Sequence, residues 1–181
     1  EHTLGENTVK ATATKDGSVE SVCTVCNEVL SAVSIPKASD IKLSATNYTY
    51  NGKVITPSVT VKGTLGKDLV KDTDYKVSYQ SGRKNVGKYA VKVTLTGNYS
   101  GTKTMYFAIN PKSTTVTKLT PGSKKMTVKW KKQATQTTGY EIQYSKSSKF
   151  TNSKIATVKK NTATSKTIKK LSAKKKYYAR I

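Results

Sequence analysis

The sequence predicts an all-β fold made of tandem β-sandwiches. Apolar and polar residues alternate over many short stretches, which is the period of strands that bury one face. Thr, Ser, Val, Lys and Tyr dominate the composition and Leu is scarce. At 181 residues the chain is long enough for two small domains and an appendage, and the spacing of the alternating stretches favours that division over one large domain.

Residues 1–38 are expected to form a small β-hairpin module that contains Cys. Asp16-Gly17 lies between two alternating stretches, where it predicts a hairpin turn. Cys23 and Cys26 form a CxxC pair. The segment resembles a small module of surface proteins from Gram-positive gut bacteria, whose fuller version has a second cysteine pair or a Cys/His set. Ala13 occupies the place where that pattern has a cysteine.

The CxxC pair has four readings: a disulfide between Cys23 and Cys26, reduced thiols, an incomplete or intermolecular metal site, and a redox centre. A structural zinc site needs four ligands, and these two thiols with His2 supply three, so we predict no metal and no other cofactor. A redox pair needs a helix N-terminus or a nearby cation, and a Thr/Val-rich hairpin has no helix. A secreted location favours the disulfide.

Residues 39–111 predict a β-sandwich, because four sets of alternating apolar residues are enough to fill its core. Asn51-Gly52 and the stretch from Gly97 to Gly101 are turn signals. Tyr89, after Asn85-Val86-Gly87-Lys88, resembles the tyrosine corner of immunoglobulin-like sandwiches. The order of these motifs resembles the immunoglobulin-like repeat found in tandem in bacterial surface proteins. The four inward sets are Val59 and Val61; Tyr75, Val77 and Tyr79; Tyr89, Val91, Val93 and Leu95; and Met105, Phe107 and Ile109.

Residues 112–181 predict a second sandwich. Met126, Val128 and Trp130 alternate on one strand, and Tyr140, Ile142 and Tyr144 alternate on the next. This pattern resembles the fibronectin type III domain, in which a core Trp faces a Tyr-x-Ile-x-Tyr strand. Leu171 precedes Tyr177 by six residues, the spacing of that fold's own tyrosine corner, and places Tyr177, Ala179 and Ile181 inward. The last strand of the fold is missing, so we expect the protein to continue beyond Ile181.

The net charge of +23 is concentrated in the last segment. Residues 112–181 hold 18 Lys and Arg180 against Glu141 alone, whereas 39–111 carry a net +7 and 1–38 a net −2. A solvated Lys face, attraction to wall polyanions or an acidic host surface, and nucleic acid all remain open. Only two of the 33 basic residues are Arg, the residue favoured for reading base edges, so we expect no nucleic acid partner.

The sequence argues against catalysis, and we expect that the protein is not an enzyme. His2 is the only His and lies at the start of the chain, which leaves no partner for a Ser or Cys nucleophile. Asp68, Asp72 and Asp74 form the only acidic cluster and read as turn residues, while Glu141 alternates with inward residues and should face solvent. No phosphate-binding glycine motif occurs and no apolar run is long enough to span a membrane. We expect any signal peptide or wall anchor to lie outside these residues.

Binding is the remaining class of function. Tyr48, Tyr50, Tyr99 and Tyr106, together with Tyr178, fall outside the inward sets and are candidate protein-binding side chains, with core filling as the alternative. The resemblance implies a secreted protein of the cell wall or cell surface, of the adhesin or immunoglobulin-binding type, with immunoglobulin or a mucosal glycoprotein as partner. The alternatives are spacer or ancillary modules of a secreted polysaccharide-degrading enzyme, and a carbohydrate-binding module.

Overall fold

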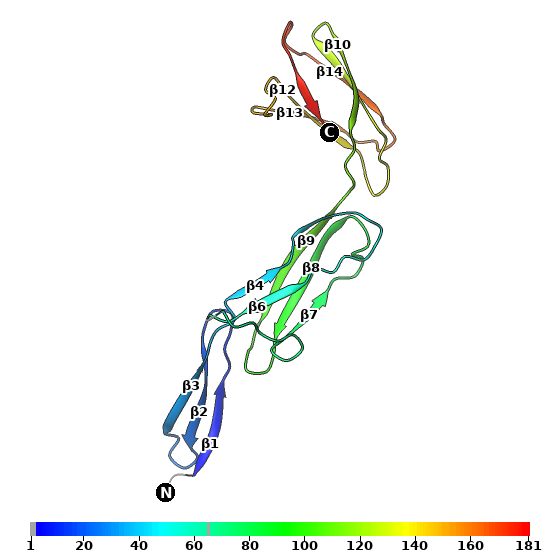
Figure 1. Cartoon of the computed structure of the whole chain (residues 1–181). Helices are drawn as coiled ribbons and strands as arrows, with labels where there is room; N and C mark the ends of the chain where they lie inside the picture. The colour runs from blue at the N-terminus through cyan, green and yellow to red at the C-terminus, as the bar shows by residue number, and fades with distance from the viewer. Residues whose placement is uncertain (1–2, 65) are drawn as a thin grey trace. The chain divides into compact units, whose positions relative to one another are not determined.

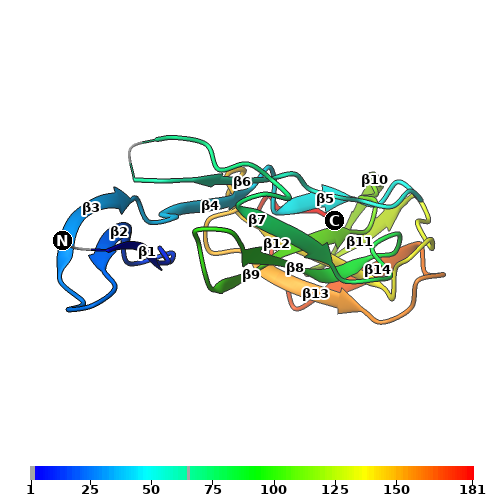
Figure 2. The same ribbon diagram turned by 90° about the horizontal axis from the view of Figure 1, so that it is seen from below.

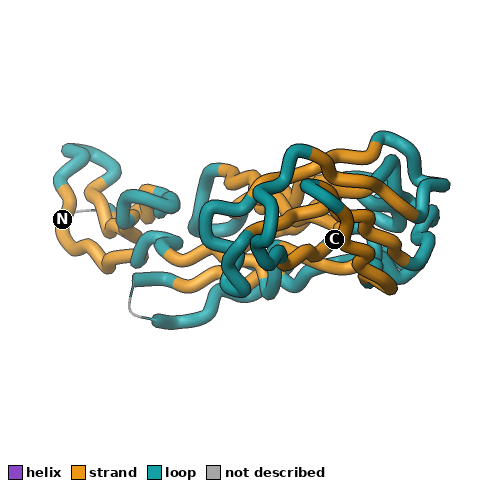
Figure 3. The backbone as a smooth tube through the Cα atoms, turned by 90° about the horizontal axis from the view of Figure 1, so that it is seen from above, coloured by secondary structure: helices purple, strands orange, loops and turns teal. Residues whose placement is uncertain are grey.

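The computed structural model describes residues 3–64 and 66–181 and confirms the all-β prediction. These residues form β-strands joined by loops and contain no helix (Figure 3). Within this described part, no apolar helix of the length that a membrane crossing requires is present. The chain divides into two compact units, Glu1–Asn110 and Pro111–Ile181, which we describe separately (Figure 1).

The N-terminal unit begins with a three-stranded antiparallel sheet in which the middle strand pairs with both others. The predicted turn at Asp16-Gly17 is wrong in detail: the chain reverses at residues 12–15, where the Thr12 hydroxyl accepts a hydrogen bond from Lys15 N at 2.9 Å. Gly17 is instead a buried strand residue, and a side chain there would lie 2.2 Å from the carbonyl oxygen of Val9. The strands are β1 (Leu4–Val9), β2 (Gly17–Cys23) and β3 (Val29–Ile35).

Backbone hydrogen bonds attach this sheet to the sandwich that follows it. Ala11 N donates to the carbonyl oxygen of Asn98 at 3.0 Å, and Ser100 N donates to that of Ala11 at 2.8 Å. Ala38, which follows the sheet, is buried in the core of the sandwich. Residues 1–110 form one compact unit. The division at residue 38, which would separate an N-terminal module from the sandwich, stays a prediction.

The sandwich of the N-terminal unit pairs a two-stranded sheet with a four-stranded one. β4 and β6 are antiparallel, and the larger sheet has the order β5-β9-β8-β7, with β5 parallel to β9 (Figure 2). Asn51-Gly52 forms the predicted turn: Gly52 has a φ of 76°, which Gly adopts readily, and Asn51 Oδ1 accepts from Lys53 N at 2.8 Å. The strands are β4 (Asp40–Leu43), β5 (Asn47–Thr49), β6 (Val59–Lys62), β7 (Tyr75–Tyr79), β8 (Gly87–Leu95) and β9 (Thr102–Asn110).

Inward tyrosines connect the core of this sandwich to its loops. Tyr75 donates to the carbonyl oxygen of Val59 at 3.2 Å, and Tyr79 donates to that of Pro57 at 2.6 Å. The Tyr89 hydroxyl lies 2.8 Å from the carbonyl oxygen of Gly82 and 2.9 Å from that of Asn85, which confirms the predicted tyrosine corner. Each ring fills the core while its hydroxyl satisfies backbone carbonyl groups.

The C-terminal unit consists of two three-stranded sheets, with orders β10-β11-β14 and β13-β12-β15. Their inward side chains form one cluster around Trp130, whose ring centroid lies 5.1 Å from that of Tyr140. Tyr177 accepts a hydrogen bond from Ser172 N at 3.1 Å, which agrees with its predicted corner role. The strands are β10 (Val116–Gly122), β11 (Lys125–Trp130), β12 (Tyr140–Ser145), β13 (Lys154–Val158), β14 (Ser165–Lys169) and β15 (Tyr178–Arg180).

Replacing Trp130 tests the core of the C-terminal unit. Trp130 is 3% exposed, so Trp130→Ala should lower the free energy of unfolding by about 3–5 kcal/mol through the cavity that it leaves. Trp130→Phe should cost less, because Nε1 is buried without a hydrogen-bond partner among the described residues and Phe removes that group. Denaturation followed by circular dichroism measures both, with the exposed neighbour Lys129→Ala as control. Equal losses for Trp130→Ala and Lys129→Ala would contradict this core.

Tyr89→Phe tests the tyrosine corner of the N-terminal unit. The change keeps the ring and removes the hydroxyl that bonds to Gly82 and Asn85, so it should cost about 1–2 kcal/mol of unfolding free energy. Tyr106→Phe is the matched control, because Tyr106 is exposed, and should change stability by less than about 0.5 kcal/mol. Urea denaturation of both variants gives the comparison. A neutral Tyr89→Phe would show that the corner adds no stability.

Candidate protein-binding face

The outer face of the sheet β5-β9-β8-β7 carries one exposed aromatic side chain, Tyr106, among alanines, hydroxyl residues and lysines. Phe107 and Ile109 of β9 are buried, so alternation turns Tyr106 and Ala108 outward. On β8, Ala90 lies directly opposite Tyr106 in the antiparallel register, and Lys88 lies opposite Ala108. The two Ala residues leave space beside the Tyr106 ring, and Lys88 and Lys92 lie diagonally opposite it on β8.

Tyr106 is the most accessible tyrosine of the chain. It is 52% exposed, whereas the other ten of the eleven tyrosines are buried or half-buried. Lys88 Nζ lies 4.6 Å from the centroid of the Tyr106 ring, which orients the ring through a cation–π contact. An exposed aromatic ring held by a neighbour loses little conformational freedom when it binds, so it suits protein recognition.

The structure fits the core-filling alternative for Tyr48, Tyr50 and Tyr99, which are half-buried. Tyr48 pairs with the buried Ile109 in the parallel register of β5 and β9, so its side chain shares the inward face, and its ring meets that of Phe107 at 5.7 Å. Tyr50 packs against the same buried cluster. Tyr99 packs against the second cluster of the sandwich. Core filling therefore accounts for these three side chains, while their predicted part in binding is untested.

The half-buried position of Tyr99 also affects the pKa of its hydroxyl group. Burial raises the pKa of the Tyr99 hydroxyl above its usual value, and the nearby Asp74 carboxylate raises it further. Tyr178, in the other unit, is half-buried beneath Lys176, whose Nζ lies 5.0 Å from the ring centroid. The set of five tyrosines thus reduces to Tyr106 as the exposed ring. Alternation places Tyr48 and Tyr50 on one face of their short segment, but only the pairing of β5 with β9 shows that this face is the inward one.

The two cysteines lie at the ends of the turn that joins β2 to β3. Cys23 is 1% exposed, whereas Cys26 is exposed. Cys26 N lies 3.4 Å from Cys23 Sγ, and Asn27 N donates to the carbonyl oxygen of Cys23 at 2.8 Å. The turn therefore brings the two residues close together, and the disulfide between them stays a prediction.

The acidic side chains of the predicted Asp cluster take part in turns, backbone hydrogen bonds and a surface ion pair. Asp74 Oδ2 accepts from Val70 N at 2.8 Å, Asp68 lies 3.4 Å from Lys62 Nζ, and Asp72 adopts a left-handed turn conformation with φ 69°. Glu141 is exposed, as predicted. His2 lies outside the described residues. Within residues 3–64 and 66–181, no three His, Cys, Asp or Glu side chains are grouped closely enough to hold a metal ion.

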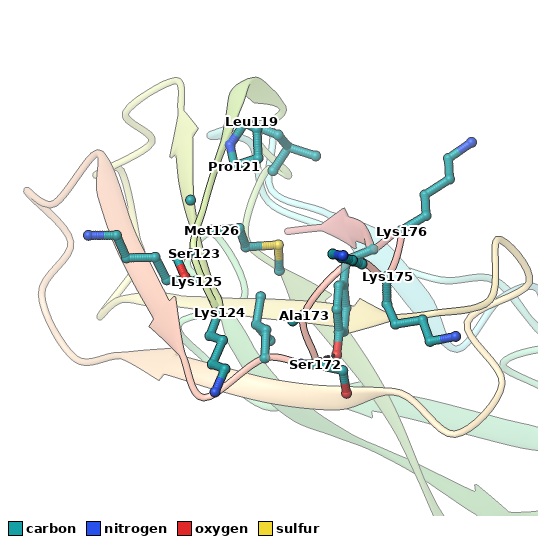
Figure 4. A pocket seen from close by; sticks show the side chains of 14 residues that line it. Leu119, Pro121, Ser123, Lys124, Lys125, Met126, Ser172, Ala173, Lys175 and Lys176 are labelled. Carbon is teal, nitrogen blue, oxygen red and sulfur yellow. Dashed lines mark hydrogen bonds between the residues drawn. The ribbon is translucent and has the colours of Figure 1, made fainter.

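A cavity of about 590 Å³ in the C-terminal unit is bordered by lysines but is not an anion pocket. It lies between the β10–β11 turn and the loop from Leu171 to Tyr177. Its apolar lining includes Leu119 and Met126. The ammonium groups of the labelled lysines at its border diverge into solvent and do not point into the cavity (Figure 4).

Hydrogen bonds from Ser172 lower the pKa of Tyr177, and Lys146 and Lys154 lower it further.

Residues 110–181 match the family model of the fibronectin type III domain. This match covers the unit whose two sheets pack around Trp130, and it confirms the resemblance on which that prediction depended. Residues 110–181 are thus similar to a fibronectin type III domain, and this similarity supports a modular organisation of the protein. Domains of this type are common non-catalytic modules. No curated protein matches the chain.

Alanine substitutions distinguish the exposed ring from the inward ones. Tyr106→Ala should change the free energy of unfolding by less than about 0.5 kcal/mol, because its ring is half solvated. Tyr48→Ala should cost about 2–4 kcal/mol, because it removes the edge contact with Phe107 and leaves a cavity. Thermal and urea unfolding of the two variants provide the measurement. A large loss of stability for Tyr106→Ala would show that this ring belongs to the core.

Proposed function

We propose that the chain supplies non-catalytic binding and display modules of a secreted, cell-surface protein. Its N-terminal unit captures a host protein, and the partner is immunoglobulin or a mucosal glycoprotein. The fibronectin type III match supports a modular, non-catalytic role. The observation that carries the capture proposal is the exposed ring of Tyr106 on the outer face of β8 and β9.

The chemistry of this face suits a protein partner. A few large side chains, with Tyr prominent among them, carry most of the binding energy of protein interfaces, and small neighbours let a partner approach closely. Ala90, Ala108 and Thr104 are the small outward neighbours of Tyr106, and Lys88 and Lys92 occupy the diagonal positions on β8. A single aromatic ring does not make the planar row that a carbohydrate-binding module uses, so the geometry favours a protein over a neutral sugar.

Binding measurements at two salt concentrations test this proposal. The whole chain is titrated against a panel of immunoglobulins and mucosal glycoproteins at about 0.15 M and about 0.5 M salt. At the higher concentration the screening length of electrostatic interactions falls to about 4 Å. A contact centred on Tyr106 should survive the higher salt. Tyr106→Ala should weaken it about 30-fold, which corresponds to a hot-spot loss of about 2 kcal/mol.

Thr60→Ala is the control variant, because Thr60 is an exposed residue of β6 in the other sheet of the same sandwich. It should leave the affinity unchanged. If no protein of the panel binds in a salt-resistant way, the capture proposal fails. Spacer modules of a secreted polysaccharide-degrading enzyme are then the better interpretation. If binding survives but Thr60→Ala and Tyr106→Ala weaken it equally, the partner is captured elsewhere.

A further inference from the structure

The outer face of the sheet β10-β11-β14 carries an ordered grid of lysines and hydroxyl groups. Met126, Val128 and Trp130 of β11 are buried, so alternation turns Lys125, Thr127 and Lys129 outward. The strand register extends each outward position across all three strands. The three rows are Lys118, Lys129 and Ser165; Thr120, Thr127 and Thr167; and Gly122, Lys125 and Lys169.

Two pairs of like charges lie directly opposite one another in this grid. Lys118 faces Lys129 across β10 and β11, and Lys125 faces Lys169 across β11 and β14. Like charges in directly opposed positions destabilise a sheet, by a few tenths of a kcal/mol to about 1 kcal/mol for each pair. The sheet therefore carries a charge arrangement that its own folding disfavours.

No carboxylate of the described residues offsets this repulsion. Glu141 is the only acidic side chain of residues 112–181, and it lies exposed on β12 in the other sheet. The ion pairs of the described part of the chain all involve acids between Asp40 and Asp72, in the other unit. An external anion is thus the natural partner of the four lysines.

The spacing of the grid suits a linear polymer. Lys125 and Lys129 are four residues apart on β11, so the two lysine rows are separated by about 13 Å along the strand. The hydroxyl row lies midway between them, and the Thr127 and Thr167 oxygens are 2.9 Å apart. A chain that runs along β11 would meet two ammonium pairs and, between them, hydroxyl groups that donate and accept hydrogen bonds.

We propose that this face binds a linear anionic glycan that bears sulfate or phosphate esters. The lysines would contact the tetrahedral anions, and the Thr row would bond to sugar hydroxyl groups. Single-stranded nucleic acid fits less well, because the grid contains no aromatic side chain on which bases stack and no Arg. A polymer with this chemistry could come from two sources: sulfated glycans of a host, or phosphate-rich polymers of bacterial walls.

The test compares two variants of the whole chain that lose the same charge. The face variant is Lys118→Gln, Lys125→Gln, Lys129→Gln and Lys169→Gln. The control variant is Lys146→Gln, Lys149→Gln, Lys154→Gln and Lys159→Gln, which changes four exposed lysines away from the grid. All eight side chains are exposed, and unchanged Trp130 fluorescence verifies the fold of both proteins. The probes are a heparin oligosaccharide, poly(glycerol phosphate), neutral dextran and duplex DNA.

We expect the face variant to bind the heparin oligosaccharide or poly(glycerol phosphate) at least about tenfold more weakly at 0.15 M salt, with a shallower dependence of affinity on salt. The control variant should lose less than about threefold. Thr127→Val with Thr167→Val, which leaves the charge unchanged, should weaken binding about threefold. The polymer that binds more tightly identifies the source.

Three results would overturn the proposal. Equal losses for the two lysine variants would mean that net charge alone attracts the polymer. Absence of binding to both anionic glycans would remove the site. Duplex DNA that binds as tightly as the better glycan, through the same four lysines, would assign the face to nucleic acid. None of these outcomes depends on Tyr106, so this test and that of protein capture fail independently.

Discussion

The central strands of the two sandwiches, such as β8, β9 and β11, bury only every second side chain, and this constraint determines both the cores and the exposed faces. In the sheet β5-β9-β8-β7 it places Phe107 inward and Tyr106 outward. In the sheet β10-β11-β14 it places Val128 inward and Lys125, Thr127 and Lys129 outward. A shift of one residue in the register would bury lysines and expose the core, so the pattern that stabilises the fold also fixes the composition of each face.

Tyrosine serves two purposes here, and the difference lies in what its hydroxyl group contacts. Tyr89 and Tyr140 are buried and bond to carbonyl oxygens of the loops at the ends of their sandwiches. Such rings are large enough to fill a thin core, while their hydroxyl groups satisfy backbone that lies out of reach of the strand ladders. Tyr106 has no such role in the fold, which leaves its ring available to a partner.

Much of the fold could be predicted from the sequence, because alternation and tyrosine spacing are local signals. Trp130, Tyr89 and Glu141 lie where these signals placed them. The burial of Tyr48 could not be read from its short segment, since it depends on a parallel pairing with Ile109 more than sixty residues away. The lysine rows were equally hidden, because they arise from the register of three strands and not from any run of charges.

Capture of a protein by the N-terminal unit requires that the Tyr106 ring is open to solvent in the free chain. Radical footprinting of the native protein, read by peptide mass spectrometry, measures the rate at which each tyrosine is modified. We expect Tyr106 to be modified fastest, and the buried Tyr75, Tyr89 and Tyr140 slowest. Modification of Tyr48, Tyr50 or Tyr99 at the rate of Tyr106 would contradict the inward positions of these rings and, with them, the assignment of the binding face.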